Sequence, residues 1–203
     1  MRARRTRFER AARRLAQALG ADECVLVGGL AVVAHGYVRA TRDVDLLTRL
    51  PLSEARRRLE GKGIPTRLRR GDPFEGDFSC LKGEVEGVPF DVLPQLVPID
   101  WDRTLPLFES RPLLRLVAVE DLLTLKMRAR GPKDLMDAAV LSLLHPETSD
   151  RARELAVAYR VVDRFEEFLA DPRLVRHARE EAAAERRRSR VRPGPRSTEK
   201  RNT

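Results

Sequence analysis

The sequence has few cysteines and no long apolar run. Its two cysteines, Cys24 and Cys80, lie far apart, which excludes a disulfide framework and a metal site built on closely spaced cysteines. The longest apolar run, 24–34, is interrupted by Gly28 and Gly29 and is shorter than the roughly 18 residues that a membrane-spanning helix needs. No hydrophobic signal core follows the basic start. We therefore expect a soluble, cytoplasmic protein with no membrane partner.

The chain is long enough to bury one core, and its charge is unevenly distributed. It has 203 residues, of which 42% are hydrophobic, and a net charge of +9. Residues 1–14 carry seven arginines and one glutamate, and residues 186–203 carry eight lysines or arginines and one glutamate. The body between them is slightly acidic. The basic ends could bind the phosphates of RNA or DNA, but solvated tails without a partner fit the charge equally well.

The hydrophobic pattern predicts strands mixed with helices. Four segments come first: an amphipathic helix over 5–19, a buried strand over 23–27, a packed helix over 30–37 and a strand over 43–48. Further strands are predicted over 65–70, 78–86 and 88–93, the last two forming a hairpin at Gly87. From Val119 to about Ala184 the pattern is helical.

These elements predict an α/β (α+β) fold, with a mixed β-sheet flanked by helices and a helical C-terminal portion. We expect a core with the N-terminal helix over residues 1–115, the helical portion over 116–185 and a basic tail over 186–203. The tail has almost no apolar residues, so it cannot bury enough surface to order itself.

Two carboxylates in the second predicted strand are the most informative feature. Asp43 and Asp45 are separated by one residue, so they project from the same face of a strand and repel each other unless a cation lies between them. Hard oxygen ligands favour Mg2+, or Mn2+, for that role. Asp91, in a later strand, alternates with Phe90 and Val92 and could supply a third carboxylate. Alternatively, the pair is a solvent-facing strand end and Asp91 stabilises a turn.

A glycine pair precedes these aspartates. Gly28 and Gly29 follow the first predicted strand and come before a helix, with thirteen residues between Gly29 and Asp43. Glycines without Cβ atoms let the backbone approach a phosphate closely, and a helix N-terminus favours an anion. The combination predicts a triphosphate site next to a metal site.

These residues resemble the nucleotidyltransferase superfamily of polymerase-β type. More narrowly, they look like its minimal bacterial and archaeal members, among them the AbiEii-like and MenT-like toxin nucleotidyltransferases and uncharacterised relatives. The resemblance covers roughly residues 23–141. The matching positions are Gly28-Gly29-Leu30-Ala31, His35-Gly36, Arg39-x-Thr41-x-Asp43-x-Asp45, Glu120-Asp121-Leu122-Leu123-x-Leu125-Lys126 and Gly131-Pro132-Lys133-Asp134-x-x-Asp137.

The resemblance implies a role for each site residue. Asp43, Asp45 and Asp91 would bind metal and act in catalysis, and Lys126 would bind the nucleotide phosphates or stabilise charge in the transition state. Nucleotide contacts would come from Gly28, Gly29, Arg39, Thr41 and Asp137. Asp134 is a weaker match than Asp137 for the last acidic position. The alternative for Lys126 is a structural lysine, with its aliphatic part buried and its charge in solvent. Leu30 replaces the family's Ser or Thr, which removes a hydroxyl.

The implied reaction is transfer of a nucleoside monophosphate from a nucleoside triphosphate, such as ATP, to a hydroxyl group, with two Mg2+ ions and release of pyrophosphate. The acceptor expected first is RNA, particularly a tRNA 3′ end, as in toxin–antitoxin systems. A hydroxyl of a partner protein comes second and a small molecule such as an aminoglycoside third. A catalytically inactive nucleotide-binding regulatory module is the alternative of another class. The sequence indicates no oligomeric state.

Overall fold

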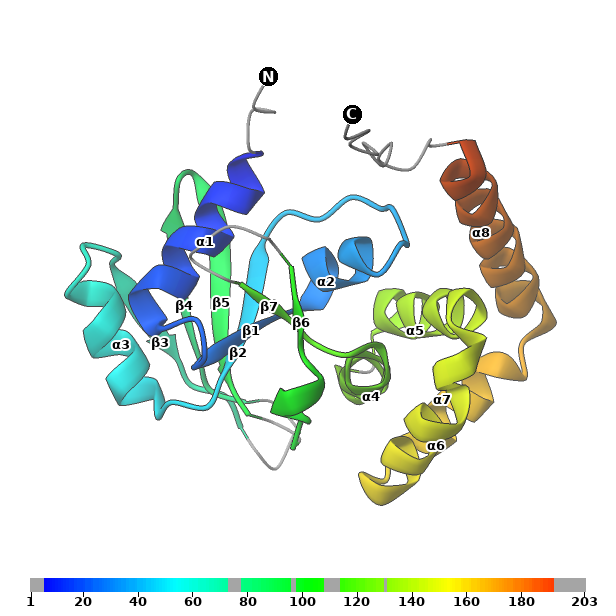
Figure 1. Ribbon diagram of the computed structural model, residues 1–203. Helices are drawn as coiled ribbons and strands as arrows, with labels where there is room; N and C mark the ends of the chain where they lie inside the picture. The colour runs from blue at the N-terminus through cyan, green and yellow to red at the C-terminus, as the bar shows by residue number, and fades with distance from the viewer. Residues whose placement is uncertain (1–5, 73–77, 96–97, 108–113, 130, 192–203) are drawn as a thin grey trace, which may run out of the picture.

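The chain folds into one mixed sheet with helices on both sides and a group of helices at its C-terminal end (Figure 1). The structure, a computed structural model, describes residues 6–72, 78–95, 98–107, 114–129 and 131–191. The strands are β1 (Cys24–Val27), β2 (Val44–Thr48), β3 (Thr66–Arg69), β4 (Cys80–Val85), β5 (Val88–Pro94), β6 (Leu105–Pro106) and β7 (Arg115–Leu116).

The helices alternate with the strands at first and follow one another after β7. They are α1 (Arg7–Leu19), α2 (Gly28–Ala34), α3 (Leu52–Glu60), α4 (Val119–Ala129), α5 (Pro132–Leu144), α6 (Ser149–Ala158), α7 (Val162–Leu169) and α8 (Pro172–Val191). Two short 3-10 helices are η2 (Trp101–Arg103) and η3 (Pro146–Thr148). Within the described ranges, no helix combines the length and the apolar character needed to cross a membrane.

The strand order is β3-β4-β5-β2-β1-β7-β6. The pairs β1–β7 and β2–β5 are parallel, and the other neighbouring strands are antiparallel. β4 and β5 form the expected hairpin, whose turn residues Glu86 and Gly87 both have positive φ, 56° and 68°. The predicted fold class, a mixed sheet flanked by helices with a helical C-terminal portion, is confirmed.

Three details differ from the sequence-based expectation. The helix after β1 begins at Gly28 and ends at Ala34, so the two glycines belong to its first turn and do not form a separate bend before it. β6 and β7 have two residues each, too few for an alternating pattern to reveal. α8 continues to Val191, so residues 186–191 of the predicted tail are helical. Residues 192–203 and the basic residues 1–5 lie outside the described ranges.

One face of the sheet carries the main core. Val44 and Leu46 of β2 are fully buried, and α1 and α3 pack over the sheet on this side (Figure 1). Fully burying such an aliphatic side chain stabilises the fold by about 1.5–3 kcal/mol. Because side chains alternate along a strand, Asp45 projects from the opposite face. The core thus determines which way the carboxylate points.

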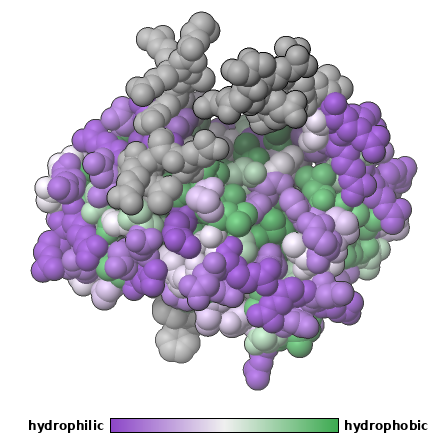
Figure 2. Space-filling view, in the orientation of Figure 1, coloured by the Kyte–Doolittle hydropathy of each residue, from purple (hydrophilic) through white to green (hydrophobic). Residues whose placement is uncertain are grey.

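The helical portion is joined to the sheet through α4, which packs on α2, α5 and α6. Two histidines connect the two portions by hydrogen bonds. Nε2 of His35 donates to the carbonyl oxygen of Val117 at 2.8 Å. Nε2 of His145 donates to the carbonyl oxygen of His35, also at 2.8 Å. Burial lowers the pKa of His35, which keeps its ring neutral. On the face seen in Figure 2, hydrophobic residues gather in the middle, between hydrophilic flanks. The two portions therefore share an apolar interior.

Replacing Asp121 with Asn is expected to stabilise the protein at pH 7. Asp121, in the first turn of α4, is 4% exposed, and burial raises its pKa from 3.8 to about 6, although the backbone N–H of Asp100 donates to it. The folded state therefore binds the proton more tightly than the unfolded chain, and the unfolding free energy falls as the pH rises through that window. Urea unfolding from pH 4 to 7 should show the stability gain of Asp121→Asn growing with pH.

The matched control is Asp150→Asn, since Asp150 also lies in the first turn of a helix, α6, but is exposed. The prediction is contradicted if Asp121→Asn does not raise the free energy of unfolding at pH 7 above the value for the Asp150→Asn control.

Candidate active site

The three predicted aspartates meet on one face of the sheet, at the neighbouring interior strands β2 and β5. Asp45 and Asp91 are register partners in the parallel pair β2–β5, so their side chains project from the same face. Asp43 precedes β2 by one residue and lies on that face by alternation. Asp43 and Asp91 both raise the pKa of Asp45 through their charges, which is possible only at short range. The structure thus brings together the carboxylates that the sequence singles out.

The surroundings of Asp45 raise the pKa of its carboxyl group strongly. Burial, then the charge of Asp43, then the charge of Asp91 raise its pKa to about 7, against the opposing effects of Lys126 and a backbone hydrogen bond from Gly29. The charge of Lys126 only partly compensates a carboxylate that lies next to two others, and the hard oxygen atoms of such a group suit Mg2+ or Mn2+. The donor set therefore fits a divalent ion.

Asp91 has a cationic partner that the sequence analysis missed. Nζ of Lys82, on β4, lies 2.6 Å from Oδ2 of Asp91. As the side chains stand, no group of three or more His, Cys, Asp or Glu residues in the described part of the chain is arranged to hold a metal ion. The metal-binding role of Asp43, Asp45 and Asp91 therefore stays a prediction, in which Asp91 exchanges Lys82 for a divalent ion.

Gly28 and Gly29 make room for the neighbouring site residues. Gly28 has a φ of +64°, and a Cβ atom there would lie 1.9 Å from Oδ2 of Asp45. A Cβ atom at Gly29 would lie 2.5 Å from Oγ1 of Thr41. Contacts below 3.0 Å are not tolerated by real Cβ atoms, so both glycines are required by close approach. The backbone at the start of α2 is in direct contact with the carboxylate site.

Thr41 bridges the glycines and the aspartates. Its hydroxyl donates to Oδ1 of Asp43 at 3.2 Å and lies against Gly29. Leu30, which follows the glycines, packs against the hydrophobic core. A hydroxyl is therefore present beside the glycines even though Leu30 does not supply one.

The helical portion contributes Lys126 and Asp137. Nζ of Lys126, on α4, lies 2.6 Å from Oδ1 of Asp134 and 2.9 Å from Oδ2 of Asp137, both on α5. The side chain of Lys126 is only 8% exposed, so its charge does not reach out to solvent. Since Lys126 also lowers the pKa of Asp45, its charge acts on the carboxylate site.

Asp137 joins Lys126 to Arg39. Nε and Nη2 of Arg39 donate to the two carboxylate oxygens of Asp137 at 2.6 and 2.5 Å, and the Asp137 side chain is 1% exposed. Such a two-pronged pair fixes the guanidinium in one orientation. Asp137 therefore holds one cation from the α2–β2 loop and one from α4 beside the glycines.

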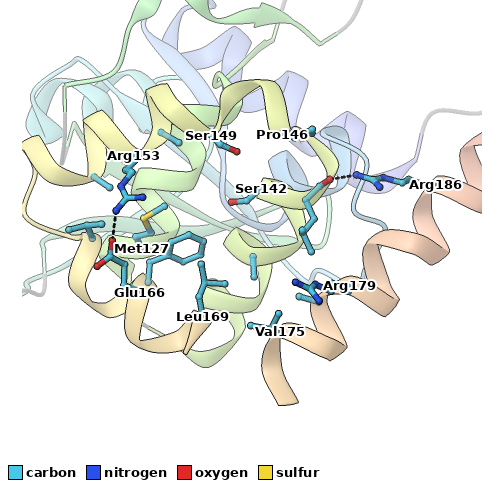
Figure 3. A pocket seen from close by; sticks show the side chains of 17 residues that line it. Met127, Ser142, Pro146, Ser149, Arg153, Glu166, Leu169, Val175, Arg179 and Arg186 are labelled. Atoms are coloured by element: carbon cyan, nitrogen blue, oxygen red, sulfur yellow. Dashed lines mark hydrogen bonds and ion pairs between the residues drawn. The ribbon is translucent and has the colours of Figure 1, made fainter. Parts of the chain in front are cut away.

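A separate cavity of about 660 Å³ lies within the helical portion (Figure 3). Apolar side chains such as Phe165, Leu169 and Val175 form much of its wall, and Arg153 pairs with Glu166 at 2.9 Å on its rim. None of the site residues predicted from the sequence lines it. Asp45, whose pKa is strongly raised, lies with Asp43 and Asp91 on the sheet face and not in this cavity, so that face is the candidate active site.

Comparison with known proteins shows a shared fold. No family model and no curated protein matches the chain. Among solved structures, ANT(2")-Ia in complex with adenylyl-2"-tobramycin aligns with a TM-score of 0.50 and 13% identity, over 72% of this chain and 93% of that one. JHP933 from Helicobacter pylori gives 0.43 and 13% identity, over 90% and 94%. A candidate nucleotidyltransferase from H. pylori gives 0.40 and 12%, over 92% and 99%. The chain has the nucleotidyltransferase fold.

Replacing Gly28 with Ala is expected to damage both the fold and the carboxylate site. The variant combines a strained backbone, which costs on the order of 1–3 kcal/mol, with displacement of Asp45. Gly63→Ala is the matched control, because Gly63 has a similar φ of +69° but nothing within 4 Å of its added Cβ atom. Urea unfolding and Mn2+ binding followed by electron paramagnetic resonance should show a larger loss in Gly28→Ala. Equal losses in the two variants would show that contact with Asp45 is unimportant.

The carboxyl group of Asp45 is expected to titrate near neutrality in the metal-free protein, at a pKa of about 7. Asp43→Asn should lower that pKa, because it removes a neighbouring negative charge. Mg2+ should bind more tightly at pH 8 than at pH 6, since the ion competes with the proton. Carboxyl carbon resonances followed by NMR measure both effects. Titration of Asp45 near pH 4 in the metal-free protein would rule out the crowded site.

Proposed function

We propose that the protein is a metal-dependent nucleotidyltransferase, which moves a nucleoside monophosphate from a nucleoside triphosphate to a hydroxyl acceptor. The observation that carries this proposal is the meeting of Asp43, Asp45 and Asp91 on one face of a nucleotidyltransferase-type sheet, against Gly28. In the reaction the acceptor oxygen bonds to the α-phosphorus, the bond from that phosphorus to the bridging oxygen breaks, and pyrophosphate leaves.

Asp43, Asp45 and Asp91 would hold the two Mg2+ ions, or Mn2+. When bound, such ions neutralise charge on the phosphates and on the attacking and leaving oxygens. The raised pKa of Asp45 and the two further carboxylates beside it support this assignment. Asp91 accepts the proton of the acceptor hydroxyl, because its side chain lies at the side of the site that opens toward β4 and is 25% exposed.

The triphosphate would lie between the start of α2 and Lys126. Gly28 and Gly29 let the backbone approach it, and the hydroxyl of Thr41 lies where Leu30 offers none. Lys126 stabilises the negative charge that develops on the leaving pyrophosphate. Asp137 keeps Arg39 and Lys126 extended toward this space and thereby orients both cations.

RNA is the acceptor that the surface supports best. The charges of Glu181 and Glu185 act on Tyr37, so the second half of α8 lies beside the loop that carries Arg39. This half of α8 also presents exposed arginines, namely Arg186, Arg187, Arg188 and Arg190. Exposed arginines on the same helix would suit a polyanionic acceptor. A tRNA end and a toxin role would match the toxin nucleotidyltransferases that the sequence resembles.

A small-molecule acceptor is the second candidate. It rests on the structure of ANT(2")-Ia with adenylyl-2"-tobramycin, in which the bound product is an adenylylated small molecule. A partner protein as acceptor and a nucleotide-binding module without catalysis are further outcomes of the same experiment.

Incubation with Mg2+ and each α-labelled nucleoside triphosphate, in the presence of total RNA, cell protein or tobramycin, is expected to label RNA. Asp43→Ala and Asp45→Ala should each reduce labelling on the order of 10³-fold, because metal-assisted charge stabilisation contributes several kcal/mol. Asp150→Ala, an exposed aspartate on α6, serves as the control and should label normally. Label on protein or tobramycin would change the acceptor, and no label on any acceptor would support the inactive module.

A further inference from the structure

A row of four charged side chains crosses the open face of the sheet. Asp45 on β2 pairs in register with Asp91 on β5, Asp91 with Lys82 on β4, and Lys82 with Arg67 on β3. Register partners project from the same face, and neighbouring strands lie about 4.8 Å apart. The row therefore runs from two carboxylates to two cations over four strands.

A groove of about 590 Å³ follows the cationic half of this row. It begins at Asp43 and Asp91 and runs past Lys82 and Glu84 to Arg67, over β5, β4 and β3. Its volume falls in the range of small-molecule sites, about 300–1,000 Å³. The groove lies on the side of Asp91 that faces away from α2 and Lys126, so it leaves the triphosphate space free.

The two cations of the groove are available to a ligand. The side chain of Arg67 is exposed and makes no ion pair or hydrogen bond with any residue that the structure describes. Lys82 pairs with Asp91, and its side chain is 30% exposed. Once Asp91 is engaged in the reaction, Lys82 loses that partner. Glu84, also exposed, is the single carboxylate besides Asp43 and Asp91 among the described residues that line the groove.

We propose that Lys82 and Arg67 form an anion subsite for the acceptor, so that the acceptor is a hydroxyl compound that also carries a phosphate. This inference rests on the nucleotidyltransferase function proposed above. Lys82 is on the strand next to Asp91 and Arg67 is on the strand after that. The backbones at these two positions therefore lie about 5 and 10 Å from the backbone at Asp91. The hydroxyl meets Asp91 while the phosphate binds farther along the row.

The subsite selects acceptors by charge. A phosphate gains charge-assisted hydrogen bonds from Lys82 and Arg67, whereas a polycationic acceptor is repelled by them. The terminal nucleotide of an RNA and a phosphorylated small molecule present the same chemistry here. A polycation such as tobramycin does not.

The test compares acceptors and variants in one series. The acceptors are a short RNA oligonucleotide, a nucleoside 5′-monophosphate and the same nucleoside without phosphate. The wild-type protein should use the two phosphate-bearing acceptors at least about tenfold better in kcat/KM, and the ratio between these two acceptors distinguishes RNA from a small molecule. Arg67→Ala and Lys82→Ala should raise the acceptor KM about tenfold and remove the preference, with the KM of the nucleoside triphosphate unchanged.

Three controls separate this inference from other causes. Lys82→Arg should restore the preference, and Lys62→Ala, which removes an exposed cation away from the groove, should not alter it. Binding of the same three acceptors, measured by calorimetry without any nucleoside triphosphate, should follow the same order and weaken in Arg67→Ala.

The outcomes decide the two proposals separately. Transfer without a phosphate preference, or with unchanged acceptor KM in both variants, overturns the anion subsite and leaves the nucleotidyltransferase function standing. No transfer to any acceptor overturns the function. The calorimetric comparison then still decides whether the groove binds phosphate, and equal binding of the nucleoside and its 5′-monophosphate would refute the subsite.

Discussion

Repulsion among buried carboxylates is the constraint on which the rest of the site depends. Asp45 is held against Asp91 by strand register and against Asp43 by alternation, and burial makes their charges costly. The neighbouring features answer that cost: Lys126 approaches from α4, a backbone hydrogen bond comes from Gly29, and Lys82 pairs with Asp91. These groups compensate the negative charge only in part, so the site would accept cations of the kind that chemistry on a triphosphate requires.

The helical portion completes the site as well as covering the sheet. Lys126 and Asp137 come from α4 and α5, and the pair between Asp137 and Arg39 fastens those helices to the loop before β2. The histidine contacts near Val117 tie the end of α2 to the same helices. The positions of Arg39 and Lys126 therefore follow from the packing of α4 and α5 against the part of the chain that contains the sheet.

Local pattern was enough to predict the fold class and to place the three aspartates on one face of the sheet, while their roles stay a prediction. Alternation around Asp45 and Asp91 determines the face of each strand, and both strands have hydrophobic partners that anchor it. Counting back from the two-residue turn at Gly87 also places Lys82 opposite Asp91, so this missed residue had a readable signal. The contact between Arg39 and Asp137 had none, because 98 residues separate them and only tertiary packing brings them together. The two-residue strands β6 and β7 were equally out of reach.

That same separation between Arg39 and Asp137 has a consequence during biosynthesis. A ribosome that has released the whole sheet-forming region has not yet released α5, so Arg39 has no carboxylate to orient it and Lys126 lacks both of its carboxylate partners. With the function proposed above, the nascent chain would stay catalytically incompetent until α5 leaves the exit tunnel. Prematurely terminated products that stop before α5 would be inert for the same reason.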